Sequence, residues 1–431
     1  MSWTEALFLH ALVLIGCLIG GVNIGAAMGI AGLVVITITS GVNLWPTLGD
    51  LVWNTTTDFN LAAVPLFILM SELVLQSGIA SRFYTGIAPW FRRVPGGLAQ
   101  TNIAGCAVFS AVAGSSVATS LTIGSVAIQE MRARGYSDSL TLGTLTAGGG
   151  LGILIPPSIP LLVYGSMTQE SVIDLFAAGM IPGILLAVFF SIYVGILATV
   201  RPSLTPRRDS FDNTGSNVLR DSVPIILLIG GVIGGMYAGI VTPTEASGLG
   251  ALFAAVIAAA YRQLNWRAVK QALRNTLLTS AVIMFITVCA QILNYSVITS
   301  GIGRGVTEWL VGLSLDPFLF FCLLILIYLI IGIFIDGLSI MLLTVPVLYV
   351  PLTAMGYNGV WLGIIMVIFI ELGLLSPPVG MNLFAVQSIA PGSTLADVSW
   401  SSLPYCLIMI GFALLLYVFP QIVLWLPAVL K

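Results

Sequence analysis

The chain has 431 residues, of which 58% are hydrophobic and 7% are charged, and its mean hydropathy is +1.08. Soluble domains carry about 25% charged residues, so this composition excludes a soluble protein and predicts an all-helical polytopic membrane protein in a lipid bilayer. The formal net charge of −2 says little about partners, and we expect no nucleic acid among them.

The N-terminal region predicts three spans. Ala6–Val22 and Ile24–Ser40 are apolar, and the lack of a basic start and of a small-residue cleavage site favours a first span over a cleaved signal. Val42–Asn60 contains two tryptophans and two aspartates, which predicts an interfacial loop. Leu61–Gln76 predicts the third span, and a basic amphipathic connection follows it as far as Arg93.

The segment Gly96–Met131 predicts a re-entrant helical hairpin. Small residues interrupt it at Gly114–Ser116, and each arm has about 16 residues, or roughly 24 Å of helix, against a hydrocarbon core of about 30 Å. Arg93 and Arg132 flank its ends, so both ends belong on one face of the membrane. Two full spans joined by a tight turn would also return to the same face.

The next segment, Ser139–Met167, predicts a broken helix, because glycines and a Pro-Pro pair interrupt its apolar sequence at Gly148–Ser158. Proline removes a backbone donor and clashes with the preceding turn, so the chain must unwind there. The core LGILIPP recurs as LGLLSPP at Leu372–Pro378, an offset of 221 residues. Two such breaks at equivalent places indicate a transporter site at a repeat interface, and two ordinary proline kinks are the simpler alternative.

The middle of the chain predicts three more spans and a linker. Ile173–Val200 is the first of these spans, and the long polar stretch Arg201–Ser222 is the natural linker between two halves. Pro224–Ile240 and Ala246–Tyr261 predict the other two spans.

The second half repeats the first. Thr276–Ser296 predicts a span, and Phe318–Leu352 predicts a second hairpin. Shifting the first tip by 221 residues gives Ile335–Gly337, where an aspartate and a glycine interrupt the apolar sequence. Gly359–Gln387 predicts the second broken helix, and Tyr405–Pro427 predicts the last span.

The basic residues test this layout. With the N-terminus in the periplasm, thirteen of the fifteen lysines and arginines face the cytoplasm, as the positive-inside rule requires, and only Arg304 and Lys431 lie outside. The first hairpin then enters from the cytoplasm and the second from outside, so the repeats are inverted, with ten full spans and two hairpins. The cytoplasmic set is Arg82, Arg92, Arg93, Arg132, Arg134, Arg201, Arg207, Arg208, Arg220, Arg262, Arg267, Lys270 and Arg274.

The residues for enzymatic chemistry are missing. The single histidine, His10, lies in the first span, so no catalytic set can be assembled and we expect no enzyme activity. No GK[ST] follows the glycine runs, so energy must come from an ion gradient or from another subunit. Five cysteines stand singly in apolar segments, which favours packing over disulfides or metal ligands: Cys17, Cys106, Cys289, Cys322 and Cys406.

The tips and breaks supply ligands for an anion and for a small cation. Hydroxyls and free N–H groups at a helix N-terminus favour anions, and carbonyls freed before proline suit a hard cation such as Na⁺, here a coupling ion rather than a tightly bound cofactor. The predicted substrate-binding residues are Ser110, Gly114, Ser115, Ser116, Thr119, Asp336, Gly337 and Asn382. The predicted Na⁺ ligands are Ser115, Ser116, Gly149, Gly152, Pro156, Asp336, Gly373, Ser376, Pro377 and Gly380.

Three carboxylates lie in or beside apolar segments, where an ionisable group indicates a functional role because burying it unpaired is costly. Asp336 could ligate a cation, carry a proton or cap the second arm of its hairpin. Glu371, just before the second break, and Glu72, late in the third span, could line the cavity or lie at the interface. We rank both below Asp336.

Four blocks of sequence resemble the large membrane subunit of tripartite ATP-independent periplasmic (TRAP) transporters, in the family's order and over essentially the whole chain. They are FSAVAGSSVATS, LGILIPPSIPLLVYG, IGIFIDGLSIMLLTVPVLYVPL and LGLLSPPVGMNLFAV. The sequence departs from the family's pattern at Gln129, where proline is expected, and at Ser376, where threonine is commoner.

This resemblance implies sodium-coupled secondary active uptake of a small organic acid, a carboxylate, across a bacterial inner membrane. It implies an elevator-type transporter of the ion transporter superfamily, with inverted repeats, two hairpins and two broken helices. A small four-helix membrane subunit and a periplasmic substrate-binding protein are the implied partners. A self-sufficient sodium–carboxylate symporter is the main alternative. The missing catalytic set argues against an enzyme, and paired hairpins that occlude from both sides argue against a channel.

The expected division of the chain follows the same resemblance. The transport domain comprises residues 95–172 and 317–390, each holding one hairpin and one broken helix. The remaining segments are 1–94 (N-terminal scaffold), 173–275 (scaffold and cytoplasmic linker), 276–316 (a span and an arm of the second repeat) and 391–431 (C-terminal span).

Overall fold

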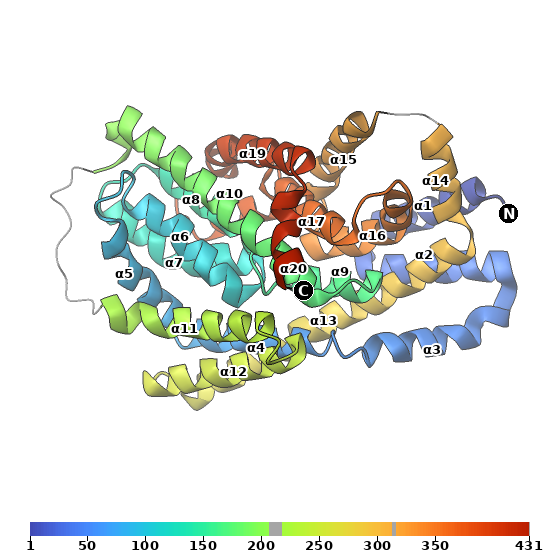
Figure 1. Ribbon diagram of the computed structural model, residues 1–431, viewed down its shortest axis with the longest axis horizontal. Coiled ribbons are helices and arrows are strands. Elements are labelled where there is room, and N and C mark those ends of the chain that lie inside the picture. The colour runs from blue at the N-terminus through green and yellow to red at the C-terminus, as the bar shows by residue number, and fades with distance from the viewer. Residues whose placement is uncertain (207–217, 313–315, 431) are drawn as a thin grey trace.

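The structure is a computed structural model that describes residues 1–206, 218–312 and 316–430 (Figure 1). Within these ranges the regular elements are all helices, as the composition predicts. Lys431 and part of the predicted linker, including Arg207 and Arg208, lie outside the described residues.

Five helices precede the first hairpin, and the last two of them form a sharply bent pair. They are α1 (Trp3–Ile19), α2 (Ile24–Ser40), α3 (Trp45–Thr56), α4 (Ala63–Gln76) and α5 (Ile79–Phe91). The bend between α4 and α5 is 71°. Gly78 makes this bend possible, because its φ of 66° lies in the left-handed region that glycine enters without steric cost.

The predicted interfacial loop at Val42–Asn60 is wrong for most of its length, because α3 occupies it. Pro46 lies in the first turn of α3, where its missing N–H costs no hydrogen bond. Leu48 of α3 is buried in one cluster with Ile36 of α2 and Ile292 of the later helix α13 (Trp266–Thr299), so α3 is held by packing as well as by its own backbone.

The first predicted hairpin and the first predicted broken helix are present. The hairpin consists of α6 (Leu98–Ala113) and α7 (Ser116–Ala133), joined through Gly114 and Ser115. The broken helix consists of α8 (Asp138–Gly149) and α9 (Ile159–Thr168), with an unwound segment between them.

Within the described residues, five α-helices connect the first broken helix to the second hairpin. They are α10 (Val172–Val200), α11 (Val218–Tyr237), α12 (Pro243–Ala260), α13 (Trp266–Thr299) and α14 (Ile302–Gly312). Gly301, between α13 and α14, has a φ of 72°, so it takes the same left-handed conformation as Gly78 between α4 and α5.

The second hairpin and the second broken helix are also present. The helices of this half are α15 (Pro317–Gly332), α16 (Gly337–Ala354), α17 (Gly359–Leu375), α18 (Met381–Ser388), α19 (Leu395–Val418) and α20 (Gln421–Leu430). The predicted single last span, Tyr405–Pro427, is wrong because α19 ends before Pro420. That proline has no N–H and restricts Phe419, which takes φ −121° and ψ 69°.

The two repeats begin their equivalent helices with equivalent caps. Ser115 caps α7 and Asp336 caps α16, and 336 − 115 is 221. Ser137 caps α8 and Asn358 caps α17, again with an offset of 221. In each case a side-chain oxygen accepts a hydrogen bond from a free N–H of the first turn. The offset found in the sequence is therefore an offset between structurally equivalent helix starts.

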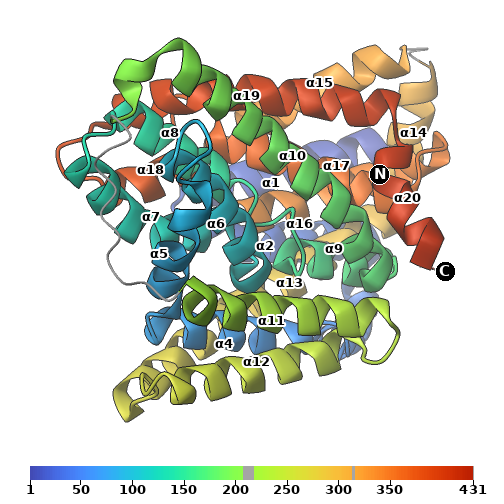
Figure 2. The ribbon, with the colours of Figure 1, turned by 60° about the vertical axis from the view of Figure 1, so that its left-hand side comes forward.

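The repeats interlock through the second parts of their broken helices. α9, from the first repeat, packs on the hairpin arm α16 of the second repeat, and α18 packs on the hairpin arm α7 of the first (Figure 2). Each broken helix therefore begins in its own repeat and ends against the other one.

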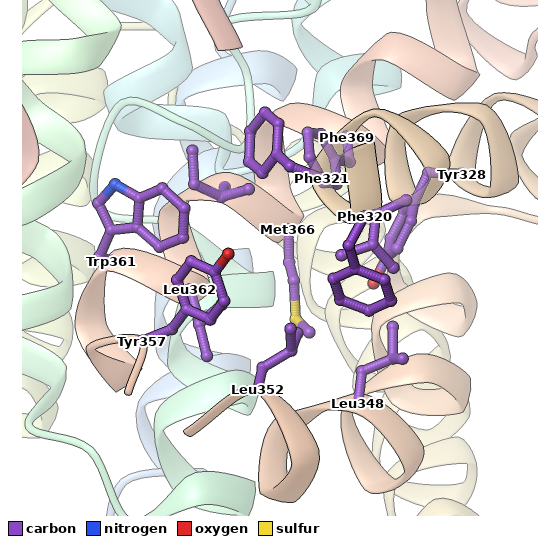
Figure 3. A pocket seen from close by; sticks show the side chains of 12 residues that line it. Phe320, Phe321, Tyr328, Leu348, Leu352, Tyr357, Trp361, Leu362, Met366 and Phe369 are labelled. Carbon is purple, nitrogen blue, oxygen red and sulfur yellow. The ribbon is translucent and has the colours of Figure 1, made fainter. Parts of the chain in front are cut away.

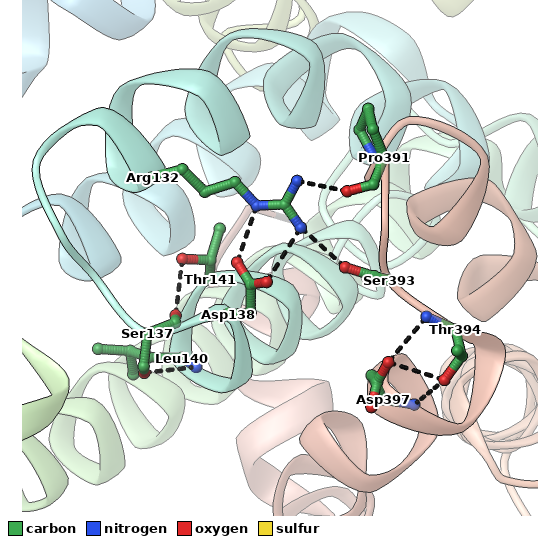
Figure 4. Close-up of polar contacts among 9 residues, drawn as sticks. All are labelled: Arg132, Ser137, Asp138, Leu140, Thr141, Pro391, Ser393, Thr394 and Asp397. Atoms are coloured by element: carbon green, nitrogen blue, oxygen red, sulfur yellow. Dashed lines mark hydrogen bonds and ion pairs between the residues drawn. The ribbon is translucent and has the colours of Figure 1, made fainter.

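Arg132, at the end of α7, ties the two repeats together at the base of the first hairpin (Figure 4). Its guanidinium donates to both carboxylate oxygens of Asp138, at 2.8 and 3.1 Å. It also donates to the Pro391 carbonyl and to the Ser393 hydroxyl, each at 2.8 Å. The segment that leaves α18 is thus fixed to the start of α8 by one side chain.

Packing separates the helices into two groups. Both views place α4, α11 and α12 along one side of the molecule, with α10 and α19 on the other side (Figures 1 and 2). α10 packs on α6, α9 and α17, and α19 packs on α8 and α17, so both lie with the hairpins and broken helices. The division into scaffold and transport domain, which placed residues 173–275 and 391–431 outside the transport domain, stays a prediction.

Seven helices of the described chain are long and apolar enough to cross a membrane, or eight if the bent pair α4–α5 forms one span. The predicted ten full spans differ from this set, because they include α1, which has 17 residues, and the two broken helices, whose parts are short, and they leave out α16, an arm of the second hairpin. The chain is therefore a multi-pass membrane protein, and the number ten stays a prediction.

Close helix packing at Gly143 yields a test of the fold. A Cβ at this position of α8 would lie 2.5 Å from the backbone oxygen of Ser401 in α19, where backbone rather than a mobile side chain must move. We expect Gly143→Ala to destabilise the purified protein by about 1–3 kcal/mol, measured by thermal unfolding in detergent. Gly230→Ala, in the interior of α11 with open space around its Cβ, is the matched control and should be neutral or slightly stabilising. An equal effect of both substitutions would contradict the α8–α19 packing.

Candidate functional site

The tip of the first hairpin lies on the break of its own repeat. Gly114 has a φ of 57°, and a Cβ there would lie 3.0 Å from the Pro157 carbonyl oxygen. A Cβ on Gly152 would lie 2.5 Å from the Cα of Ser116. Two unwound backbones therefore meet with no side chain between them, and glycine is required on both sides of the contact.

The tip of the second hairpin lies against α17 and reaches the first break. A Cβ on Gly337 would lie 2.9 Å from a methyl group of Ile370 and 3.9 Å from one of Ile153, which belongs to the first break. Asp336 accepts a hydrogen bond from Ser339 N at 3.1 Å, so it caps α16, one of its three predicted roles. The cap leaves its other possible roles untested.

One cavity of about 190 Å³ is shared by both tips and both breaks. It receives residues from the two hairpins, from the flanks of the two breaks and from α13. Its lining residues are Gly114, Ser115, Ser116, Val117, Ile153, Ile159, Pro160, Thr279, Ile283, Asp336, Gly337, Leu338, Leu374 and Met381. Five of the predicted site residues are therefore brought together here: Gly114, Ser115, Ser116, Asp336 and Gly337.

The electrostatic character of this cavity comes from backbone rather than from side-chain cations. Four helices, α7, α9, α16 and α18, begin at its wall, and their first turns carry free N–H groups and the positive end of the helix dipole. Among the described residues that line the cavity, Asp336 is the one charged residue, and none is a lysine, arginine or histidine. An anion in this cavity would be held by helix N-termini and hydroxyls.

Glu371, which we ranked below Asp336 from the sequence, stands beside this cavity. Its side chain is 1% exposed. It accepts hydrogen bonds from the Ser116 hydroxyl, at the first tip, and from Asn382 Nδ2, at 3.2 Å. The carboxylate therefore joins the first hairpin to both parts of the second broken helix. The available signal was an ionisable residue inside the otherwise apolar helix α17.

The other predicted residues occupy the surroundings of the cavity. The Ser110 hydroxyl donates to the Cys106 carbonyl within α6 at 2.6 Å, so it is satisfied inside its own helix. Thr119 and Asn382 are fully buried, and neither lines the cavity. Ser376 donates to the Pro377 carbonyl at 3.3 Å.

The remaining predicted cation ligands mark close approaches of backbone. Gly149 faces Ser120, Gly373 crosses Gly332, and Gly380 lies on the Leu374 carbonyl. Pro156 lies in the first break and does not line the cavity. The structure therefore places these residues at the breaks, where we predicted them, and their role as cation ligands stays a prediction.

Two residues weighed from the sequence lie elsewhere. Glu72 accepts from Asn275 Nδ2 at 2.9 Å and joins α4 to α13. His10 is buried between the Ala6 carbonyl and the Ser296 hydroxyl, each 2.8 Å away, and joins α1 to α13. Both are packing contacts away from the two tips.

A second cavity lies among α15, α16 and α17 and is lined by aromatic and aliphatic side chains (Figure 3). The hydroxyl of Tyr328 in its wall already donates to Thr344 at 2.7 Å. No charged side chain lines this cavity, so it lacks the groups that would orient an organic acid.

The chain is similar to proteins of one family over nearly its whole length. Residues 11–422 match the family described as tripartite ATP-independent periplasmic transporter, DctM component. The chain is 32% identical to the C4-dicarboxylate TRAP transporter large permease protein DctM of Pseudomonas aeruginosa, over 93% of each protein. It is 29% identical to the sialic acid TRAP transporter large permease protein SiaM of Vibrio cholerae, over 96% of each.

Two further comparisons extend this picture. The chain is 30% identical to the ectoine TRAP transporter large permease protein TeaC of Halomonas elongata, over 85% of this chain and 86% of that one. Among solved structures, the YdaH transporter of Alcanivorax borkumensis has a similar fold, with a TM-score of 0.69, 17% identity and 89% of each chain covered. At this identity the likeness concerns the fold alone.

The shared cavity yields a distance test. In a variant whose native cysteines are replaced by alanine, we expect Ser115→Cys and Leu338→Cys to be joined by a short bifunctional thiol reagent, because both positions line one cavity. The control pair is Ser115→Cys with Ser125→Cys, which lie ten residues apart along one helical stretch, about 15 Å. Mass spectrometry of the digested protein reads the product. Equal yields from both pairs, or no product from the tip pair, would contradict the shared cavity.

Proposed function

Because this chain belongs to the DctM-component family of tripartite ATP-independent periplasmic transporters, we propose that it takes up a small organic acid by coupling its movement to Na⁺. It is a large permease subunit in the bacterial inner membrane, not an enzyme. The observation that carries the proposal is the cavity between the two hairpin tips, where four helix N-termini meet without a basic side chain.

The anionic character of the substrate is supported by these N-termini. A carboxylate would accept hydrogen bonds from the free N–H groups and hydroxyls at Ser115 and Ser116. The relatives are named for C4-dicarboxylates, sialic acid and ectoine, so family membership leaves the individual acid open. A periplasmic binding protein would largely determine which acid is selected.

Sodium coupling is supported by the backbone of the two breaks. Pro156 and Pro377 have no N–H to donate to the carbonyls of Gly152 and Gly373, of which Gly373 accepts from Ser376 N at 3.3 Å instead, and carbonyl oxygens at a break suit a small hard cation. Ser116, Ser376 and Asn382 add side-chain oxygens or amides nearby. A cation at a break would lower the electrostatic cost of placing an anion in the adjacent cavity. In this way the Na⁺ gradient could drive the uptake of the anionic substrate.

An elevator movement is supported by the way the repeats interlock. The two hairpins and two broken helices hold each other through α9 on α16 and α18 on α7, so they can move as one body. The bent arms α5 and α14 contact α6 and α16, at the border with the remaining helices. We propose that this body carries the shared cavity across the membrane.

The proposed partners are a small four-helix membrane subunit and a periplasmic binding protein, with the N-terminus in the periplasm by the distribution of basic residues. The binding protein would land on the outer face, which on this orientation includes α3 and the region around Arg304. A symporter that works without a binding protein is the alternative that the experiments below separate.

The first test of this function is the ion requirement. We expect uptake by the complete reconstituted transporter to need an inward Na⁺ gradient, because the proposed cation site lies beside the anion cavity. Tracer uptake into proteoliposomes with Na⁺ or choline outside measures this directly. Full uptake driven by a proton gradient in sodium-free buffer would contradict sodium coupling.

The second test is the requirement for the binding protein. Substrate added alone to the reconstituted membrane subunits should hardly be transported, and the matching binding protein should restore uptake. Uptake is measured with and without the binding protein at the same substrate concentration. Robust uptake without it would favour the self-sufficient symporter.

A further inference from the structure

The carboxylate of Glu371 is buried where three parts of the site meet. It accepts hydrogen bonds from the Ser116 hydroxyl of the first hairpin and from Asn382 Nδ2 of α18. From the side of the first break, a Cβ on Gly150 would lie 3.4 Å from Glu371 Oε2. α7, the first break, α17 and α18 therefore enclose one acidic group that is 1% exposed.

No basic group neutralises this carboxylate within the described residues. The two ion pairs found there join Arg132 to Asp138 and Arg134 to Glu130, and neither includes Glu371. The hydroxyl and the amide that contact Glu371 are neutral donors, which solvate a negative charge without cancelling it. An ionised carboxylate at this depth is costly unless a cation accompanies it.

Three further oxygens, on the two helices whose Ser116 and Asn382 contact Glu371, have no hydrogen-bond partner in the described protein. They are Asn382 Oδ1, Thr119 Oγ1 and Ser120 Oγ, and each belongs to a fully buried residue. Thr119 and Ser120 follow Ser116 by three and four positions on α7, so they share its helix face. Buried oxygens without protein partners are uncommon in native proteins and are satisfied by ordered water, a ligand or an ion.

Gly149 and the helix α18 flank this face of α7. Gly149, at the end of α8, faces the Ser120 hydroxyl so closely that a Cβ would occupy the same space. α18 packs on α7 and brings Asn382 to the same region. The unpartnered oxygens therefore lie on α7 and α18, the same two helices whose Ser116 and Asn382 contact the negative charge of Glu371.

We propose that Glu371 supplies the negative charge of a monovalent-cation site completed by Asn382 Oδ1 and the hydroxyl oxygens of Thr119 and Ser120. The described residues contain no group of three His, Cys, Asp or Glu, so the donor set suits Na⁺ rather than a transition metal. A proton would neutralise Glu371 but would use one acceptor and leave the other oxygens unsatisfied. This inference rests on the proposed function only for the choice of Na⁺ as the physiological ion.

The location of this site explains how a cation could act on the substrate cavity. Ser116 lines that cavity and also donates to Glu371, so the two sites share a residue of the hairpin tip. A cation at Glu371 would hold the first hairpin against the second broken helix. It would also place a positive charge beside the cavity, which favours an anion there.

The test is Na⁺ binding without transport. Purified protein is unfolded thermally at increasing NaCl, with choline chloride holding the ionic strength constant, because an ion that binds the folded state raises its stability. We expect Na⁺ to stabilise the wild type, and Glu371→Gln, which keeps the size of the side chain, to need at least about tenfold more Na⁺ for the same effect. Glu72→Gln, which changes a carboxylate held by an amide outside this site, is the matched control and should behave like the wild type.

A second variant decides the matter if Glu371→Gln does not fold. Thr119→Val removes only the unpartnered oxygen from a side chain of the same shape, so we expect a folded protein with a several-fold weaker response to Na⁺. A wild-type response in both variants would overturn the proposal. Stabilisation of the wild type by low pH and not by Na⁺ would overturn it too, because the counter-charge would then be a proton.

Transport separates this inference from the proposed function. Sodium-driven uptake that persists unchanged in Glu371→Gln would contradict a cation site at Glu371. It would leave the proposed function, sodium-coupled uptake, unaffected. Wild-type uptake that ignores the Na⁺ gradient would instead contradict the proposed function, even if Na⁺ still stabilised the protein through Glu371.

Discussion

Backbone that unwinds at membrane depth must find its hydrogen-bond partners within the protein, because the hydrocarbon offers none. In this chain the interruptions meet this requirement largely by local bonds, such as Gly152 N to the Gly149 carbonyl, Ile155 N to Leu151 and the Ser158 hydroxyl to Ile153, and they pack closely on one another. The first tip lies on the Pro157 carbonyl and on Gly152, and the second tip lies against Ile370 and approaches the first break. Glycine at these contacts is a consequence of the same constraint, since a Cβ would push the interruptions apart.

The convergence of the interruptions creates the chemistry of the site. Helices α7, α9, α16 and α18 all begin around one cavity, so their free N–H groups and dipoles point to a region without lysine or arginine. Glu371 lies behind this region and binds residues of both repeats. The cavity that attracts anions and the buried carboxylate of Glu371 are thus joined by Ser116. This closeness suits the coupling of an anion to a cation.

The sequence predicted the local elements of the site well, because each depends on short-range chemistry. Gly114 allows a left-handed backbone, Asp336 caps the helix that follows it, and the Pro-Pro pairs remove backbone donors, so each favours an interruption of a helix. The offset of 221 residues paired these interruptions correctly, down to the caps Ser115 and Asp336. The helix α3 was missed because the tryptophans and aspartates of Val42–Asn60 are typical of a membrane interface. The one proline of this segment, Pro46, lies in the first turn of α3, where it does not break a helix.

The contacts between repeats could not be predicted in the same way. Ser116 and Glu371 are 255 positions apart, and their contact depends on α18 and α7 packing across the repeats. Arg132 was predicted to mark the cytoplasmic face, and its bonds to Pro391 and Ser393 follow from the same interlocking. A repeat in the sequence shows which segments are equivalent. It does not show that α9 packs on the second repeat and α18 on the first, which depends on the folded chain.

The central claim is that the four interruptions form one site that holds both a cation and an anion. The most direct measurement is a density map of the transporter in lipid, obtained once in Na⁺ and once in choline. The account predicts that both tips line one cavity in either salt, and that density appears next to Glu371 and Asn382 only in Na⁺. Tips that lie apart on opposite sides of the bilayer, or a polar cluster at Glu371 that is identical in both salts, would contradict it.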